Sequence, residues 1–123
     1  MSSFPVAEDV LDETVEVLQM ADVSKVLSLV VTRVHQLLRD HQLIAVRRDG
    51  IAAVPELFLD LDEGAVLKGV PGLIAVLADG GYTDEEILRW LFTEDESLPG
   101  RPADAMHGDL AREVMRRAQA MAF

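Results

Sequence analysis

The sequence predicts a mostly α-helical α+β fold with one small β-hairpin, and three observations carry this prediction. Apolar residues recur at the i, i+3, i+4 spacing of amphipathic helices in several separate stretches. Asp49-Gly50 lies between two short apolar stretches, and this dipeptide suits a type I′ turn because both central residues need positive φ. Thr83 and Glu86 have the spacing of a capping box, which marks the start of a helix.

Length and composition limit the classes of protein to which the chain could belong. A chain of 123 residues, half of them hydrophobic, can form one compact domain or two very small ones that share a core. No apolar run approaches the roughly 20 residues that span a bilayer, and the N-terminus lacks the pattern of a signal peptide. The absence of cysteine excludes disulfides, Cys-based zinc sites and thiol nucleophiles. We therefore expect a cytoplasmic protein with no membrane partner.

The first part of the chain is predicted to be a flexible acidic tail over residues 1–12, because it is polar and has no clear period. In residues 14–20 the apolar residues fit the alternation of a strand as well as the spacing of a helix, so a short strand and the start of a helix both remain possible there. A first helix follows, capped by Asp22 or Ser24. Thr32 is the expected N-cap of a second helix from Arg33 to about His41.

Residues 13–60 have the order of a winged helix-turn-helix. Two short helices separated by about three residues are followed by a two-stranded hairpin, the predicted wing, over residues 43–54. The second helix, about residues 32–41, would be the recognition helix. Its apolar stripe is Val34, Leu37 and Leu38, and the polar side chains lie largely on the other face.

Residues 61–123 are predicted to form a helical C-terminal domain. Pro71 suits a first helical turn, and the apolar run after it stops at Gly80-Gly81. The capping box opens a helix that continues to Phe92. A loop then leads to a short helix over Pro102–His107 and a longer one over Asp109–Met121.

Charge is segregated along the chain. The formal net charge is -11, and a uniformly acidic surface would repel the phosphates of nucleic acid. Residues 24–55, however, carry five basic side chains and two acidic ones, a net charge of +3. This basic segment coincides with the predicted helices and wing, so we expect double-stranded DNA to be the partner.

The residues expected to contact DNA share exposed positions on the two helices and at the wing tip: Lys25, Thr32, Arg33, Gln36, Arg39, Arg47 and Arg48. Arg33 and Gln36, with His35 beside them, can reach base edges. Lys25 and Arg39 would bind phosphates and set the orientation. A solvated turn in an ordinary small domain is the alternative interpretation of the arginine pair.

Other side-chain groups give no sign of catalysis or of metal binding. Asp60, Asp62 and Glu63 lack the spacing of a calcium-binding loop and favour a solvated acidic loop. The three histidines have no metal-ligand spacing, and no glycine-rich phosphate loop is present. The basic side chains of the last helix are expected to pair with nearby acids: Arg112, Arg116 and Arg117. We therefore expect no metal, no cofactor and no enzyme.

Three stretches, VSKVLSLVVTRVHQLLRDHQLIAVRRDG, KGVPGLIAVLADGGYTDEEILRWLFTEDESL and RPADAMHGDLAREVMRRAQAMAF, resemble the small actinobacterial winged helix-turn-helix DNA-binding proteins. The resemblance implies a winged N-terminal domain on DNA, packed on a helical C-terminal domain. The chain departs from the family at Leu29-Val30, where a glycine is usual, and in a short loop over residues 98–101.

The stretch WLFTEDESLPGRPADA also resembles the toxin-binding domain of a class of antitoxins. This second resemblance implies a different function, in which the C-terminal helices bind a protein partner and the DNA-binding half is regulatory or vestigial.

Overall fold

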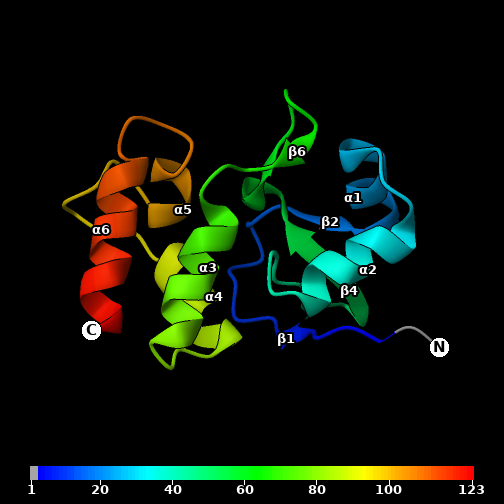
Figure 1. Ribbon diagram of the computed structural model, residues 1–123, viewed down its shortest axis with the longest axis horizontal. Helices are drawn as coiled ribbons and strands as arrows, with labels where there is room; N and C mark the ends of the chain where they lie inside the picture. The colour runs from blue at the N-terminus through cyan, green and yellow to red at the C-terminus, as the bar shows by residue number, and fades with distance from the viewer. Residues whose placement is uncertain (1–2) are drawn as a thin grey trace.

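The computed structural model describes residues 3–123 and confirms the predicted fold class of helices with a small sheet (Figure 1). The N-terminal half consists of four strands and two helices, which are β1 (Ala7–Glu8), β2 (Val17–Gln19), α1 (Met20–Leu27), α2 (Val31–Arg39), β3 (Val46–Arg48) and β4 (Ile51–Pro55). The strands form one sheet in the order β1-β3-β4-β2. Only β1 runs parallel to its neighbour, and the other pairs are antiparallel.

The rest of the chain is mostly helical and occupies the other end of the molecule (Figure 1). Its elements are η1 (Glu56–Phe58), β5 (Leu59–Asp60), β6 (Ala65–Val66), α3 (Val70–Asp79), α4 (Asp84–Leu91), α5 (Pro102–Ala105) and α6 (Ala111–Ala122). Strands β5 and β6 form a separate two-stranded sheet, and α3 packs along α6. Among residues 3–123, no helix combines the length and the apolar character that crossing a bilayer requires.

One hydrophobic core connects the two halves. Val34 and Leu38 of α2 are fully buried in the same cluster as Phe58 of η1 and Leu73 and Leu88 of the C-terminal helices. The core therefore continues across the predicted boundary at residue 60. Where the domains divide stays a prediction, and the shared core means that each half is expected to depend on the other for stability.

Several predicted helix ends are shifted in the structure. A strand ends at Gln19 and α1 begins directly at Met20, so neither Asp22 nor Ser24 caps the helix as predicted. Helix α2 begins at Val31 after the extended residue Val30, and no side chain caps it, so the prediction of a Thr32 cap is wrong. The helices start earlier than predicted because the preceding backbone leads straight into them from an extended conformation.

The predicted flexible tail is wrong for residues 7 and 8. Ala7 and Glu8 form β1 beside β3, and the Ala7 backbone N–H donates to the Ala45 oxygen at 2.8 Å. Ala7 is also buried, with 4% of its surface exposed. The acidic composition of this stretch concealed the strand, because a two-residue edge strand is held by its partner's backbone rather than by a pattern of its own.

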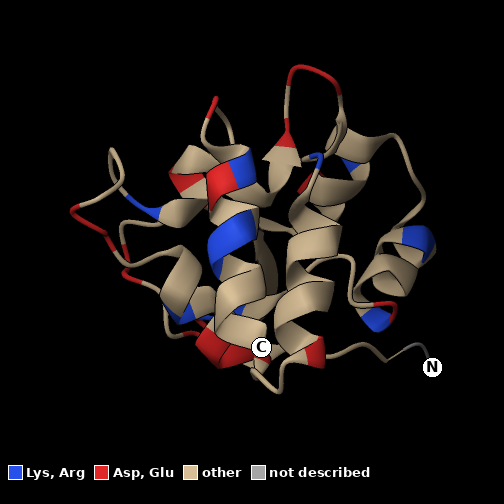
Figure 2. Cartoon of the chain, turned by 60° about the vertical axis from the view of Figure 1, so that its left-hand side comes forward, with Lys and Arg blue, Asp and Glu red and all other residues tan. Residues whose placement is uncertain are grey.

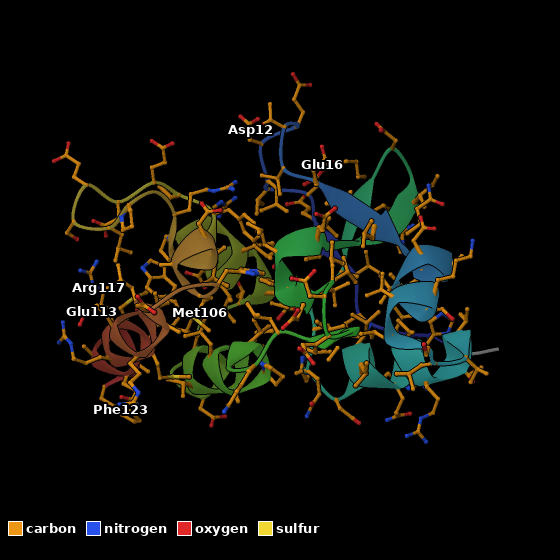
Figure 3. All side chains as sticks on the ribbon, turned by 90° about the horizontal axis from the view of Figure 1, so that it is seen from above. Asp12, Glu16, Met106, Glu113, Arg117 and Phe123 are labelled. Atoms are coloured by element: carbon orange, nitrogen blue, oxygen red, sulfur yellow. The ribbon has the colours of Figure 1, made fainter. Side chains whose placement is uncertain are left out.

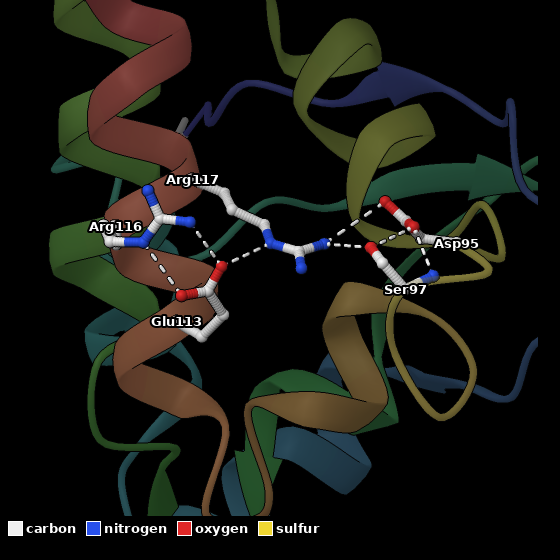
Figure 4. Close-up of polar contacts among 5 residues, drawn as sticks. All are labelled: Asp95, Ser97, Glu113, Arg116 and Arg117. Atoms are coloured by element: carbon white, nitrogen blue, oxygen red, sulfur yellow. Dashed lines mark hydrogen bonds and ion pairs between the residues drawn. The ribbon is translucent and has the colours of Figure 1, made fainter.

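The C-terminal half contains the capping box and a second polar cluster. The Thr83 side chain accepts from the Glu86 N–H at 3.2 Å, and the Glu86 carboxylate accepts from the Thr83 N–H at 2.9 Å, which confirms the predicted start of α4. Figure 4 shows how α6 holds the loop that follows α4. Arg117 contacts Asp95 at 3.4 Å and the Ser97 hydroxyl at 2.8 Å.

Glu113 lies between two arginines of the same helix. It accepts from Arg116 at 2.6 Å and from Arg117 at 2.7 Å, and these hydrogen bonds lower its pKa to about 2 (Figure 4). The prediction that the basic residues of α6 pair with acids is therefore confirmed for Arg116 and Arg117. It is wrong for Arg112, which forms no ion pair within residues 3–123.

Candidate nucleic-acid interface

Helices α1 and α2 form a helix-turn-helix whose turn is closed by a serine. Ser28 has the left-handed conformation, with φ of 54°, in the place where glycine is common. The backbone N–H of Leu29 donates to the Ser24 oxygen at 3.1 Å, and the Ser24 hydroxyl donates to the Leu29 oxygen. These bonds close the turn, so the sequence can dispense with glycine there.

Helix α2 presents one face to the core and one to solvent. Val34 and Leu38 are buried, whereas Thr32 and Arg33 are exposed. Arg33 and Lys25 form no ion pair within residues 3–123, so both cations remain available to a ligand. The residues at the start of α2 therefore have the exposure that a recognition helix needs at its N-terminal end.

Two other predicted contact residues of α2 are bonded to each other. Arg39 donates from Nε and Nη2 to the Gln36 side-chain oxygen at 3.2 and 2.9 Å. Gln36 in turn donates to Asp40 at 2.9 Å, and Arg39 also donates to the Ser3 backbone oxygen at 3.0 Å. Both side chains are exposed, but they must exchange these bonds before they can contact a base or a phosphate.

The N-terminal segment packs on the same helix. The rings of Phe4 and His35 stack with centroids 4.5 Å apart and an interplanar angle of 23°. His35 is therefore occupied by an intramolecular contact, whereas Thr32 and Arg33 at the start of α2 remain exposed.

The wing is the hairpin of β3 and β4, and its turn has the predicted geometry. Asp49 and Gly50 have φ of 53° and 80°, as the two central residues of a type I′ turn require. Arg47 and Arg48 lie next to this turn at the end of β3, opposite Ala52 and Ile51 respectively. Successive side chains of a strand point to opposite faces, so the two arginines have different surroundings.

Arg47 is exposed and Arg48 is not. The only hydrogen bond of the Arg47 guanidinium within residues 3–123 is a long one, 3.3 Å from Nη1 to the Gly50 oxygen. The Arg48 side chain is 18% exposed and donates to Asp9 at 2.7 Å. It also donates to the backbone oxygens of Val15 at 2.6 Å and Asp12 at 3.1 Å. Arg48 thus ties the wing to the segment between β1 and β2.

The charge pair between Arg48 and Asp9 affects both pKa values. Hydrogen bonding from Arg48 lowers the pKa of the Asp9 carboxyl, and the Asp9 carboxylate raises the pKa of the Arg48 guanidinium. The positive charge of Arg48 is neutralised locally, which leaves Arg47 as the cation that the wing tip offers to a ligand. The sequence could have indicated this split, because a strand alternates its side chains with period two.

Most of the acidic residues lie outside the helix-turn-helix and the wing. Figure 2 shows Asp and Glu gathered in the loop between β5 and β6 and around the C-terminal helices. Asp60 ends β5, and Asp62 and Glu63 lie in that loop. Across residues 3–123, no three His, Asp or Glu side chains come close enough together to hold a metal ion. The C-terminal half also carries Lys and Arg, but acidic residues outnumber them there, whereas the helix-turn-helix and the wing carry a net positive charge.

Comparison with known proteins gives matches along almost the whole chain. The family model described as "DNA-binding protein Rv2175c, wHTH domain" matches residues 3–59, and "Rv2175c C-terminal domain of unknown function" matches residues 67–122. The DNA-binding protein Rv2175c of Mycobacterium tuberculosis (strain ATCC 25618 / H37Rv) is 44% identical over 135 residues, which cover 100% of this chain and 92% of the relative.

A solved structure agrees with the fold. The NMR structure of Rv2175c matches with a TM-score of 0.87 at 44% identity, over 98% of this chain and 90% of that one. These matches confirm the predicted winged helix-turn-helix and the resemblance to the small actinobacterial DNA-binding proteins of this fold.

Proposed function

Since this chain belongs to the family of the DNA-binding protein Rv2175c, we propose that it is a non-enzymatic regulator that binds duplex DNA. In this proposal α2 enters the major groove and the β3–β4 wing lies against the adjacent backbone. The observation that carries it is that Lys25, Arg33 and Arg47 are exposed on one helix-turn-helix and its wing and form no ion pair within residues 3–123, in a chain whose net charge is -11.

Individual roles follow from the surroundings of each side chain. Arg33, exposed near the start of α2, and its neighbour Thr32 reach base edges. Lys25 and Arg47 contact phosphates. Gln36 and Arg39 join the interface once their mutual bond opens, and Arg48, already bound to Asp9, positions the wing without touching DNA. The role of Arg48 replaces the DNA contact that the sequence suggested equally for Arg47 and Arg48.

The experiment is a salt titration of binding to labelled duplex DNA, followed by fluorescence anisotropy. A plot of log K against log salt concentration should be linear, and each lost phosphate contact should flatten its slope by about 0.9. We expect Lys25→Gln and Arg47→Gln each to flatten the slope by about that amount. Arg89→Gln, on the outer face of α4, is the matched control and should leave the slope unchanged.

Two outcomes would overturn the proposal. The first is wild-type protein that shows no salt-dependent binding to any duplex even at low ionic strength. The second is an Arg89→Gln variant that loses as much affinity as the two interface variants, because the attraction would then come from general charge rather than from a defined face.

A protein partner on the C-terminal helices is the alternative proposal, and the antitoxin-like stretch over residues 90–105 is its support. Immobilised full-length protein should then retain a specific protein whose binding is lost when α4 and α6 carry surface substitutions. Capture that is unaffected by such substitutions would argue against this alternative.

A further inference from the structure

A pocket of about 400 Å³ lies where the start of α3 meets the end of α5 and the start of α6. This volume falls within the range of small-molecule sites in proteins. The residues that line it come from these three places and are Leu67, Lys68, Gly69, Met106, His107, Gly108, Ala111, Arg112 and Met115. Figure 3 shows Met106 at the junction of the C-terminal helices. The pocket lies outside the helix-turn-helix and the wing.

Apolar side chains form the floor and the walls of the pocket. Leu67 and Met106 are buried and belong to the hydrophobic core, and Met115 is half-buried beside them. Gly69 has φ of 95°, which favours glycine, and a Cβ there would lie 3.0 Å from the Met106 methyl group. Methionine side chains are flexible and polarisable, so the walls can adapt to aromatic or aliphatic ligands.

The opening of the pocket is kept clear by a second glycine. A Cβ added at Gly108 would meet no atom within 4 Å, so nothing fills the space in front of this residue. The neighbouring wall is fixed, because the Nε2–H of His107 donates to the Leu57 oxygen at 2.7 Å. The pocket is therefore both accessible and bounded by anchored residues.

The charges at the pocket are positive and unpaired. Lys68 and Arg112 line it, both are exposed, and neither forms an ion pair within residues 3–123. The described lining contains no Asp or Glu. By contrast, Arg101, Arg116 and Arg117 pair with carboxylates, and Arg89 of α4, which forms no ion pair within residues 3–123, lies outside the pocket lining. In a chain of net charge -11, two unpaired cations beside an apolar pocket are complementary to an anionic ligand.

We propose that this pocket binds a small organic anion with an apolar body, of the class of aromatic or branched aliphatic carboxylates. The apolar body lies between Met106 and Met115, and the carboxylate lies at the opening between Lys68 and Arg112. This binding site is additional to the DNA-binding function and does not depend on it.

A matched pair of probes tests the proposal on the full-length protein. The probes are 1-naphthaleneacetate and its uncharged amide, 1-naphthaleneacetamide, which share the same apolar body. Binding is followed by NMR of ¹³C-methyl-labelled methionine, and the chain has 5 methionines. We expect the Met106 and Met115 signals to move with both probes, while Met20 of α1 stays in place. Two exposed cations should favour the carboxylate by about twofold to 25-fold over the amide.

Three variants separate the contributions of charge and of shape. Lys68→Gln combined with Arg112→Gln should abolish the preference for the carboxylate but leave amide binding unchanged. Gly108→Leu places a side chain in the empty opening and should weaken both probes more than tenfold. Arg89→Gln removes an exposed cation of α4 outside the pocket and serves as the control, with the binding of both probes unaltered.

The proposal is overturned if neither probe moves the Met106 and Met115 signals at millimolar concentration. Equal affinity for acid and amide in the wild-type protein would also overturn it, because the cations would then have no role. Met106 and Met115 signals that shift when ligand-free protein is diluted would show that a second copy of the chain covers the pocket, and the proposal would likewise fail.

Discussion

The arginine pair at the wing allows a sharp prediction, because substituting each of these two neighbouring residues should affect a different property of the protein. Arg48→Ala removes a guanidinium that is 18% exposed and bonded to Asp9 and to two backbone oxygens. Arg47→Ala removes an exposed guanidinium with a single 3.3 Å bond. We expect the first substitution to lower stability and the second to lower affinity for DNA.

The magnitude follows from the contacts. Each of the two bonds to backbone oxygens contributes about 0.5–1.5 kcal/mol net. The ion pair with Asp9 contributes about 0.5–1 kcal/mol, since both partners keep some contact with water. Arg48→Ala should therefore destabilise the fold by about 2–3 kcal/mol, which lowers Tm by about 10 °C for a chain of this size. Arg47→Ala should cost less than about 0.5 kcal/mol.

Urea and thermal unfolding measure stability, and the salt titration measures the DNA contact. Arg47→Ala should flatten the log-log slope by about 0.9, and Arg48→Ala should leave it within error of the wild type at temperatures where the variant is folded. Asp9→Asn is the milder companion variant, because it removes the ion pair and retains the two backbone bonds of Arg48. An Arg48→Ala protein with unchanged Tm and a flattened slope would refute the assignment.

Other predictions concern the C-terminal half. Thr83→Ala removes the cap of α4 and should lower the free energy of unfolding by about 1 kcal/mol, measured in urea, whereas Thr83→Ser should be nearly neutral. Bonds from Arg116 and Arg117 hold the pKa of Glu113 at about 2, below its ordinary value. The stabilisation from its charge is therefore complete above the ordinary pKa of a glutamate and lost as the pH falls through about 2. Carboxyl NMR should record that low pKa and its rise in Arg117→Gln, and an unchanged pKa in the variant would contradict the bonding. Gly80→Ala would place a Cβ 2.7 Å from a side-chain carbon of α6, so Tm should fall and the amide exchange of the last turn of α6 should accelerate; an unaltered Tm would disprove this contact.

Local signals in the sequence predicted much of the fold. The capping box at Thr83 and the turn at Asp49-Gly50 each depend on residues within one turn of chain, and both have the predicted geometry. The apolar stripe of Val34 and Leu38 placed the buried face of α2 correctly. These features are determined by the residues themselves, so a single sequence is enough to identify them.

Features that depend on distant partners could not be predicted in the same way. Strand β1 exists because β3 offers it an open edge, and α1 needs no side-chain cap because β2 leads directly into it. The left-handed Ser28 was missed because glycine is the usual signal at that position. The pairing of Arg48 with Asp9 joins residues far apart in sequence, and no spacing rule relates them.

The alternation of side chains along β3 gives the two arginines complementary tasks in the proposed function. Without Arg48 on the inner face, the wing would lose its bond to the segment between β1 and β2, and the exposed Arg47 would be carried on a looser hairpin. A phosphate contact is more favourable when the cation is already positioned, because less conformational entropy is lost on binding. Arg48, whose charge is balanced by Asp9, therefore helps to position Arg47. A few positioned cations are enough for an acidic chain to direct DNA to one face.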